Sequence, residues 1–448
     1  MTRLPEAILF HARDFLAEEF ARFHKLLPDP ERVYVVSKTS EAETVRSIDQ
    51  AANIFNAAEY IGKASDGPIV DDAVFAAMHQ NVQRDRYLRR LDPATVVHVV
   101  HGVRAMLDDI GARFRVLLYL DEPVSGFINE CLNQWVSMHG GTPAHFQTTW
   151  LPGYLFFCSD ATQQKPIPLH FLDDAHAIVD AHFAKRLRNE APPTYLLDYS
   201  SRRHTLRQAL TFGMKGVYRR IRNAESFLDA DPWPHTFQAQ ALSRSTVARY
   251  NTVKSLQAMS GARFVVYPMH YEPEAVITYF SDFTDQLTMV NAVFDNLPAH
   301  AYLVLKEHPS QPGAVHHPKW RQLRELERVL VLKGTESMSE ILRLDDVTVV
   351  SIASNAAIEA AIHARPSFVM GQPHFRDLPG ITFVNHRQPF SLLNAREPAS
   401  REEIVAWYGD FAARHAIQGI FMRGRTNVPE AERLLQTLWD RARMSAGA

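Results

Sequence analysis

Glycine is scarce in this chain. Only 19 of its 448 residues are glycine, about 4% where folded proteins average roughly 7%. No two glycines are separated by a single residue, so the G-x-G-x-x-G fingerprint of dinucleotide-binding folds is absent, and so is a Walker A loop. A phosphate bound by this chain would therefore be held by helix ends and side chains rather than by a glycine cradle.

Cysteine, long apolar runs and a charge excess are missing as well. Two cysteines, Cys131 and Cys158, are too few for a disulfide framework and fit a reducing compartment. No apolar run exceeds about five residues, against roughly 20 in a membrane helix, and the N-terminus lacks the apolar core of a signal peptide. Lys and Arg (48) nearly balance Asp and Glu (50), so no nucleic-acid partner is expected. These features predict a cytoplasmic protein, and peripheral attachment to the inner membrane stays open.

Short apolar runs alternate with helical patterns such as Ser40–Tyr60, which is typical of α/β proteins with parallel sheets. The predicted strands are Ala7–Phe10, Val33–Ser37, Phe114–Leu120, Tyr154–Cys158, Phe264–Tyr267, Ala301–Lys306, Val329–Lys333, Val347–Ser351 and Ser367–Met370. A division near residue 260 gives two Rossmann-like lobes, 1–259 with a helical section and 260–448. The last helix, near Pro429–Met444, is expected to pack back on the first lobe. Two such lobes would enclose a cleft at the carboxyl ends of their strands.

A polar segment follows the predicted strand that ends at Lys306. It continues as Glu307, His308 and Pro309, which places an ammonium, a carboxylate and an imidazole at the edge of the sheet. Lys and His both donate hydrogen bonds to phosphate, and proline stiffens the turn. A polar loop without a ligand would have the same composition.

Two further segments have the same placement. After the strand Val347–Ser351, Ser354 or Asn355 could cap the next helix, and a helix N-terminus holds phosphate without glycine. Glu359, one turn into that helix, could accept from ribose hydroxyls, although an ordinary capped βα unit looks the same. The loop after Phe264–Tyr267 concentrates ionisable groups, namely His270, Glu272 and Glu274.

Together these segments resemble the capsule polysaccharide synthesis family, which contains β-Kdo transferases. The family has a His-x-Gln-Pro-Glu stretch, a Leu-Pro pair before a strand, and then Lys-Glu-His-Pro. The family's third block is usually close to Ser-Gly-Thr, with Glu-Ala and Gly-Lys-Pro further along the chain. The matching residues here are His270-Tyr271-Glu272-Pro273-Glu274, Leu297-Pro298, Lys306–Pro309, Ala353-Ser354-Asn355, Glu359-Ala360 and Ala364-Arg365-Pro366. The resemblance covers roughly residues 260–375, and Glu272, Ala353-Ser354-Asn355 and Ala364-Arg365 depart from the family's pattern.

The resemblance implies a two-lobed (GT-B) glycosyltransferase that uses a CMP-activated ulosonic acid such as CMP-Kdo and a glycan or glycolipid acceptor. Lobe 260–448 would then bind the nucleotide sugar, and lobe 1–259 would supply the acceptor and catalytic side. His308 would contact the CMP phosphate, and Ser354 and Asn355 would cap it from the helix. The remaining donor contacts would come from His270, Glu272, Glu274, Lys306, Glu307, Pro309 and Glu359. Such enzymes generally need neither a metal nor another cofactor.

Carboxylates in the first lobe are candidates for the catalytic group. Asp121 and Glu122 end the strand Phe114–Leu120, and Asp198 lies within a mostly apolar run. Retaining transfer by double displacement needs a carboxylate at the anomeric carbon, and inverting transfer needs a base. The retaining β-Kdo enzymes that this chain resembles are thought to use a carboxylate in a double displacement. For Asp198, a helix cap or an ion pair with Arg202 explains the residue equally well.

Residues 185–222 form a basic stretch. They hold ten Lys or Arg against Glu190 and Asp198, a local charge of 10 − 2 = +8. A solvated helical face is the default explanation, and docking to anionic lipid or to a phosphorylated glycolipid is the alternative.

No metal site is expected. Asp229-Ala230-Asp231 matches a D-x-D motif, but the Pro-Trp-Pro that follows indicates a turn. His98 and His101 lack a third ligand. Two other functions stay open: a UDP-sugar enzyme of the same fold, and a non-catalytic component of capsule export or glycan binding.

Overall fold

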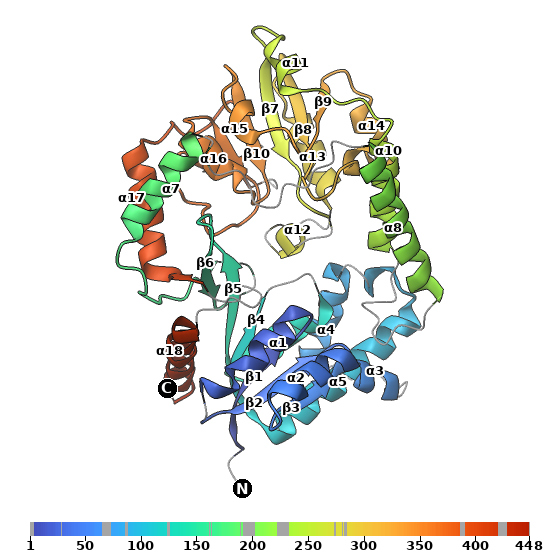
Figure 1. Cartoon of the computed structure of the whole chain (residues 1–448), viewed down its shortest axis with the longest axis vertical. Coiled ribbons are helices and arrows are strands. Elements are labelled where there is room, and N and C mark those ends of the chain that lie inside the picture. Colours follow the sequence, from blue (N-terminus) through green and yellow to red (C-terminus); the bar gives the residue numbers. More distant parts are fainter. Residues whose placement is uncertain are drawn as a thin grey trace. The chain divides into compact units, whose positions relative to one another are not determined.

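A computed structural model describes the chain except for residues 1–3, 28, 65–72, 86–87, 123–125, 161, 163, 189, 191–201, 222–232, 273–274, 280, 282–284, 386–389, 420–427 and 448. The chain divides into two compact units (Figure 1). Unit 1 comprises Met1–Asp173, Asn223–Ala230 and Ala412–Ala448, and unit 2 comprises Asp174–Arg222 and Asp231–Phe411. This division differs from the single boundary expected near residue 260. Much of the helical section belongs to unit 2, where Phe237 is buried in the core.

Unit 1 is built on a seven-stranded sheet in the order β13-β6-β5-β4-β1-β2-β3. Its strands are β1 (Glu6–His11), β2 (Glu31–Val36), β3 (Asn53–Asn56), β4 (Arg115–Asp121), β5 (Thr142–Thr148), β6 (Tyr154–Cys158) and β13 (Ala416–Gln418). β1 to β5 pair in parallel, and β6 and β13 are antiparallel additions at one edge.

Helices cover both faces of this sheet. They are α1 (Phe15–Arg22), α2 (Thr39–Ile48), α3 (Ala57–Lys63), α4 (Ala73–Arg84), α5 (Pro93–Arg113), α6 (Phe127–Met138) and α18 (Val428–Gly447). Side chains alternate along β1: Ile8 and Phe10 join a core with α1, α2 and α18, whereas Ala7 and Leu9 join one with α4, α5 and α6. The terminal helix α18, expected to pack back on the first lobe, belongs to unit 1.

Unit 2 is built on a six-stranded, fully parallel sheet in the order β12-β11-β10-β7-β8-β9. Its strands are β7 (Arg263–Pro268), β8 (Ala301–Lys306), β9 (Val329–Leu332), β10 (Val347–Ser351), β11 (Ser367–Val369) and β12 (Ile381–Phe383). The described helices are α7 (Ala175–Leu187), α8 (Arg202–Ile221), α10 (Trp233–Ser245), α11 (Val253–Gln257), α12 (Ala275–Tyr279), α13 (Gln286–Asp295), α14 (Arg321–Arg324), α15 (Met338–Ile341), α16 (Ala356–Ile362) and α17 (Arg401–His415). The apolar strands are buried on both faces, as parallel sheets require.

The predicted α/β class with two Rossmann-like units is confirmed. The helix predicted over Ser40–Tyr60 is wrong, because α2 ends at Ile48 and the chain then adds the short edge strand β3. Among the described residues, we find no helix with the length and hydrophobicity that crossing a bilayer requires.

Candidate functional site

The strand order of unit 2 changes direction between β7 and β10. From β7 the chain adds β8 and β9 on one side, and it then returns to add β10, β11 and β12 on the other. Ligands of open α/β sheets bind where loops diverge in this way, at the carboxyl ends of the strands. The three polar segments singled out in the sequence follow β7, β8 and β10, so one edge of the sheet brings them together.

Two buried glutamines hold the loop after β7. Gln286 Oε1 accepts the His270 N–H at 2.6 Å, and Gln286 Nε2 donates to the His270 carbonyl at 2.8 Å. Gln311 makes the same pair of bonds with the Glu272 backbone, at 2.9 and 2.6 Å. Each side-chain amide thus pairs with the backbone as a neighbouring strand would. The Glu272 carboxylate accepts from Lys319 Nζ at 2.6 Å.

His308 presents a hydrogen-bond donor at this edge. Its Nδ1 accepts the Ser310 N–H at 3.1 Å, so the proton of the neutral ring lies on Nε2. Burial and the nearby Lys306 ammonium lower the pKa of His308 to about 4, so the ring is neutral at pH 7. The Tyr271 and His308 rings meet edge to face, with centroids 6.0 Å apart.

His270 is a second neutral imidazole in the same region. Burial, aided by His308, lowers the pKa of His270 to about 3. The ring is 6% exposed, and its Nε2 has no hydrogen-bond partner among the residues that the structure describes. Burial thus favours the uncharged form of both imidazoles at neutral pH.

Lys306 and Glu307 are buried side chains that brace the loops. Lys306 Nζ donates to the Gly334 carbonyl at 2.9 Å, and burial lowers the pKa of this ammonium to about 8. Glu307 accepts from Gly313 N (2.9 Å), Val315 N (3.2 Å) and the Tyr250 hydroxyl (3.1 Å). Burial raises the pKa of Glu307 to about 7 despite these bonds.

At the start of α16 the residues have unequal roles. The Ser354 hydroxyl accepts the Ala356 N–H at 3.2 Å and so caps the helix, whereas Asn355 is exposed and makes no side-chain cap bond. Glu359 forms an ion pair with Arg186 of α7. Burial raises the pKa of Glu359, and Arg186 opposes that shift. The ribose contact expected of Glu359 stays a prediction.

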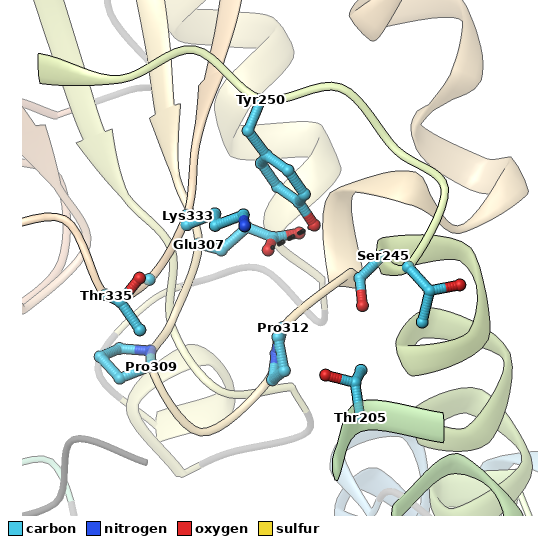
Figure 2. A pocket seen from close by; sticks show the side chains of 10 residues that line it. Thr205, Ser245, Tyr250, Glu307, Pro309, Pro312, Lys333 and Thr335 are labelled. Carbon is cyan, nitrogen blue, oxygen red and sulfur yellow. Dashed lines mark hydrogen bonds between the residues drawn. The ribbon is translucent and has the colours of Figure 1, made fainter. Parts of the chain in front are cut away.

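A pocket of about 110 Å³ opens beside the loop after β8 (Figure 2). It is lined by Thr205, Ser245, Thr246, Tyr250, Glu307, Pro309, Pro312, Lys333, Gly334 and Thr335. Its hydroxyl groups and Lys333 make it polar. The volume is below the ~300 Å³ of small-molecule sites, so a whole nucleotide does not fit it in this conformation.

Unit 1 has its own change of strand direction, between β1 and β4. His11 is the last residue of β1 and Arg13 lies just after it, and Asp121 is the last residue of β4 and is followed by Glu122. Arg13 Nη2 donates to Glu122 Oε2 at 2.8 Å, and His11 Nδ1 lies 3.4 Å from Asp121 Oδ2. Burial raises the pKa of the Glu122 carboxyl, and Arg13 opposes that shift. The two carboxylates named from the sequence thus lie where a ligand of this sheet would bind.

The two carboxylates differ in accessibility. Asp121 has no exposed surface, and its Oδ2 accepts the Tyr119 hydroxyl at 2.6 Å. The Glu122 side chain is 39% exposed. In this conformation only Glu122 can reach a substrate, and Asp121 can act only through its neighbours.

Asp121 belongs to a buried polar cluster with unsatisfied atoms. His11 Nδ1 and Asn129 Oδ1 lie 3.1 Å apart, and His145 Nε2 contacts Asn133 Oδ1 at 3.0 Å. Four buried atoms of this cluster have no hydrogen-bond partner among the described residues: His11 Nε2, Asp121 Oδ1, Asn129 Nδ2 and His145 Nδ1. Buried polar atoms are seldom left unpaired, which makes this cluster a candidate for a functional role.

Comparison with known proteins decides the family. The model of the family described as "Capsule polysaccharide biosynthesis protein" matches residues 160–421, more than half of the chain. The chain belongs to the capsule polysaccharide biosynthesis family. This confirms the resemblance drawn from the three motif segments, all of which lie within the matched residues.

Individual relatives are more distant. The capsule polysaccharide export protein KpsS of Escherichia coli is 26% identical over 182 residues, which are 39% of this chain and 46% of that protein. The chain thus spans about half the length of this curated relative.

Solved structures also align with the chain. KpsC β-Kdo 2,7 transferase of Thermosulfurimonas dismutans aligns at 15% identity and a TM-score of 0.31, covering 75% of this chain and 89% of that one. The UDP-GlcNAc 2-epimerase of Methanocaldococcus jannaschii aligns at 9% identity and a TM-score of 0.25, covering 97% and 99%. Superpositions with scores this low carry no argument about fold or function.

Some predicted residues lie outside the described part of the chain, and some structural partners were missed. Asp198, Glu274 and the Asp229-Ala230-Asp231 motif are outside the described residues. The partners that sequence reasoning missed are His11, Arg13, Asn129, His145, Arg186, Gln286, Gln311 and Lys319. His11 had a usable signal, since it directly follows the predicted strand Ala7–Phe10 as Asp121 directly follows Phe114–Leu120, and Arg13 lies two residues further along.

Proposed function

We propose that this chain is a glycosyltransferase of capsule assembly. It moves Kdo or a related ulosonic acid from a CMP-activated donor to a surface polysaccharide or glycolipid acceptor. Family membership supports a role in capsule assembly. The observation that supports a phosphate-bearing sugar donor is the neutral Nε2–H group of His308 at the strand-order reversal of unit 2.

On this proposal His308 stabilises the leaving group. When the bond between the anomeric carbon and the phosphate oxygen breaks, CMP departs with the electron pair. A donor already aimed at the oxygen where negative charge develops lowers the barrier without reorganisation. The backbone held by Gln286 and Gln311 keeps the neighbouring loop fixed during this step. The proposal assigns no metal and no other cofactor.

Glu122 is the first-unit carboxylate proposed to meet the substrate. In a retaining reaction its oxygen attacks the anomeric carbon as CMP leaves, which forms a glycosyl ester. The acceptor hydroxyl then gives its proton to a base and attacks the same carbon, and the carboxylate leaves with its electron pair. Asp121 is proposed to orient the residues behind Glu122.

The donor assignment is tested by titration calorimetry of the full chain with CMP and with UDP. We expect CMP to bind more tightly, and tighter UDP binding would replace the CMP proposal with a UDP-sugar enzyme. Mass spectrometry of the chain after incubation with CMP-Kdo tests the ester: an added mass of one sugar on the peptide that contains Glu122 supports retention.

The name of the E. coli relative favours one alternative, a non-catalytic component of capsule export. Donor turnover separates the two functions. If the purified chain neither hydrolyses nor transfers CMP-Kdo with any glycan or glycolipid acceptor, the enzyme proposal fails and the export component remains.

A further inference from the structure

The helix α8 packs on its own unit through small residues. Thr205 and Ala209 are 5% and 6% exposed, and Gly216 is also buried. The position a Cβ would take on Gly213 lies 4.0 Å from Ala239 Cβ of α10. These residues let α8 and α10 approach closely, so this face of α8 is its inner face.

Four large apolar side chains of α8 lie outside this inner face and are exposed. Leu206, Leu210, Met214 and Val217 are 43%, 68%, 60% and 55% exposed. Their spacing of four, four and three residues places them in one stripe along the helix. A surface helix of a globular protein normally has the reverse arrangement, with its large apolar residues inward. The stripe is therefore an apolar surface that the described residues of unit 2 do not bury.

The charge of α8 is of one sign. The helix contains six Arg or Lys and no Asp or Glu. Arg207 and Lys215 are exposed. Elsewhere in the basic stretch, Arg186 is paired with Glu359 and Arg188 with Glu190, so they do not add to a cationic surface. The helix that carries the apolar stripe therefore has a sequence of purely positive charge, and its two described basic side chains, Arg207 and Lys215, are exposed.

We propose that α8 lies in the surface of an anionic phospholipid leaflet. The stripe Leu206, Leu210, Met214 and Val217 enters the acyl boundary, and the basic side chains contact the lipid phosphates. The positive charge of α8 calls for an anionic partner, and the apolar stripe requires that this partner also be apolar over the length of the helix. An anionic phospholipid leaflet meets both requirements. A second copy is disfavoured, since two-fold pairing would place one cationic α8 against another. The proposal goes beyond the transferase activity and does not depend on the donor.

Co-sedimentation of the full chain with lipid vesicles tests the proposal. The vesicles are phosphatidylcholine alone or phosphatidylcholine mixed with phosphatidylglycerol. We expect sedimentation with the anionic vesicles only, and release when salt is raised severalfold, because salt screens exposed charges. The variant L210E/M214E should bind the anionic vesicles about tenfold or more weakly.

A matched variant and a second measurement keep the test decisive. L393E/V428E changes two apolar side chains that are 59% and 56% exposed elsewhere, and it should bind as the native chain does. Circular dichroism melts establish that each variant is folded. Equal binding by L210E/M214E and L393E/V428E overturns the proposal, as does a folded native chain that sediments with neither vesicle. The proposal is also overturned if light scattering shows that the native chain is a dimer and that L210E/M214E is a monomer, because the stripe would then bind a second copy of the chain.

Discussion

Both units have a reversal of strand order in their sheet, but the side chains beside the reversal differ in chemistry. In unit 1 the strand order reverses between β1 and β4, and the residues gathered there are the carboxylates Asp121 and Glu122 with His11 and Arg13. In unit 2 it reverses between β7 and β10, and the neighbouring loops carry neutral histidines and a buried ammonium. Topology therefore sets where a ligand meets each sheet, and the residues after the strands set what that ligand can be.

The difference extends to how the sites are held. Both regions keep buried atoms without a hydrogen-bond partner among the described residues, such as Asp121 Oδ1 in unit 1 and His270 Nε2 in unit 2, and in unit 2 the loop backbones are braced by Gln286, Gln311 and Glu307. A carboxylate that must change its bonding during a reaction benefits from an oxygen atom that is not already held by a hydrogen bond. A group that only binds phosphate benefits from a fixed frame. Four substitutions test this contrast.

Glu122→Gln should have the largest effect. Loss of the accessible carboxylate should lower transfer from CMP-Kdo about a thousandfold or more while CMP binding is unchanged, because the proposed donor contacts lie in unit 2. Initial rates and calorimetry measure the two quantities. Glu18→Gln, which removes an exposed carboxylate of α1 in the same unit, is the control. If E122Q retains full turnover, unit 1 does not supply the reacting carboxylate.

Glu307→Gln should change how stability depends on pH. The folded-state pKa of Glu307 is raised to about 7 from 4.5, so the folded state holds the proton more tightly than the unfolded state. The free energy of unfolding therefore loses up to about 3 kcal/mol as pH rises from about 4.5 through 7, and glutamine removes this loss. Urea unfolding at pH 5 and pH 8 should show that the native chain loses stability relative to E307Q at the higher pH. A pH-independent difference would contradict this, and exposed Glu325→Gln is the control.

His308→Ala should weaken CMP binding roughly 10–100-fold, the usual cost of a hydrogen bond to a charged group. His308→Gln places an amide N–H near the position of Nε2 and should restore part of the affinity. Calorimetry at pH 7 measures both. Equal losses in the two variants would mean that the ring acts by shape and not as a donor.

Gln311→Ala should have the smallest effect. It leaves the Glu272 N–H and carbonyl without their partner, which should cost about 1–2 kcal/mol in the free energy of unfolding. CMP binding should weaken with it, because the loop after β7 loosens. Gln436→Ala on the exposed face of α18 removes an amide of unit 1 and should change neither quantity. No change in Q311A would show that the frame of unit 2 is less rigid than its bonds suggest.

Much of the fold could be predicted from local pattern, and the failures have clear causes. The strands β8 and β10 are found at their predicted bounds because they are mostly apolar runs that end in a polar residue, Lys306 and Ser351. β5 was missed because Pro143, His145 and Gln147 break the apolar pattern of a buried strand. The contribution of glycine was also missed: a Cβ on Gly334 would lie 2.7 Å from Pro309 Cα, so a single glycine allows the close turn at the phosphate-binding candidate.

The sequence by itself determined the class of the protein, its family and the groups that end each strand, because periodicity and short motifs are local properties. Only the tertiary structure decided which strand ends are neighbours, since strand order is fixed by pairing between distant segments. It also decided that Glu122 is accessible where Asp121 is not, and that His308 is neutral with its proton on Nε2. Accessibility and protonation depend on burial and on partners far along the chain, and no local pattern contains them.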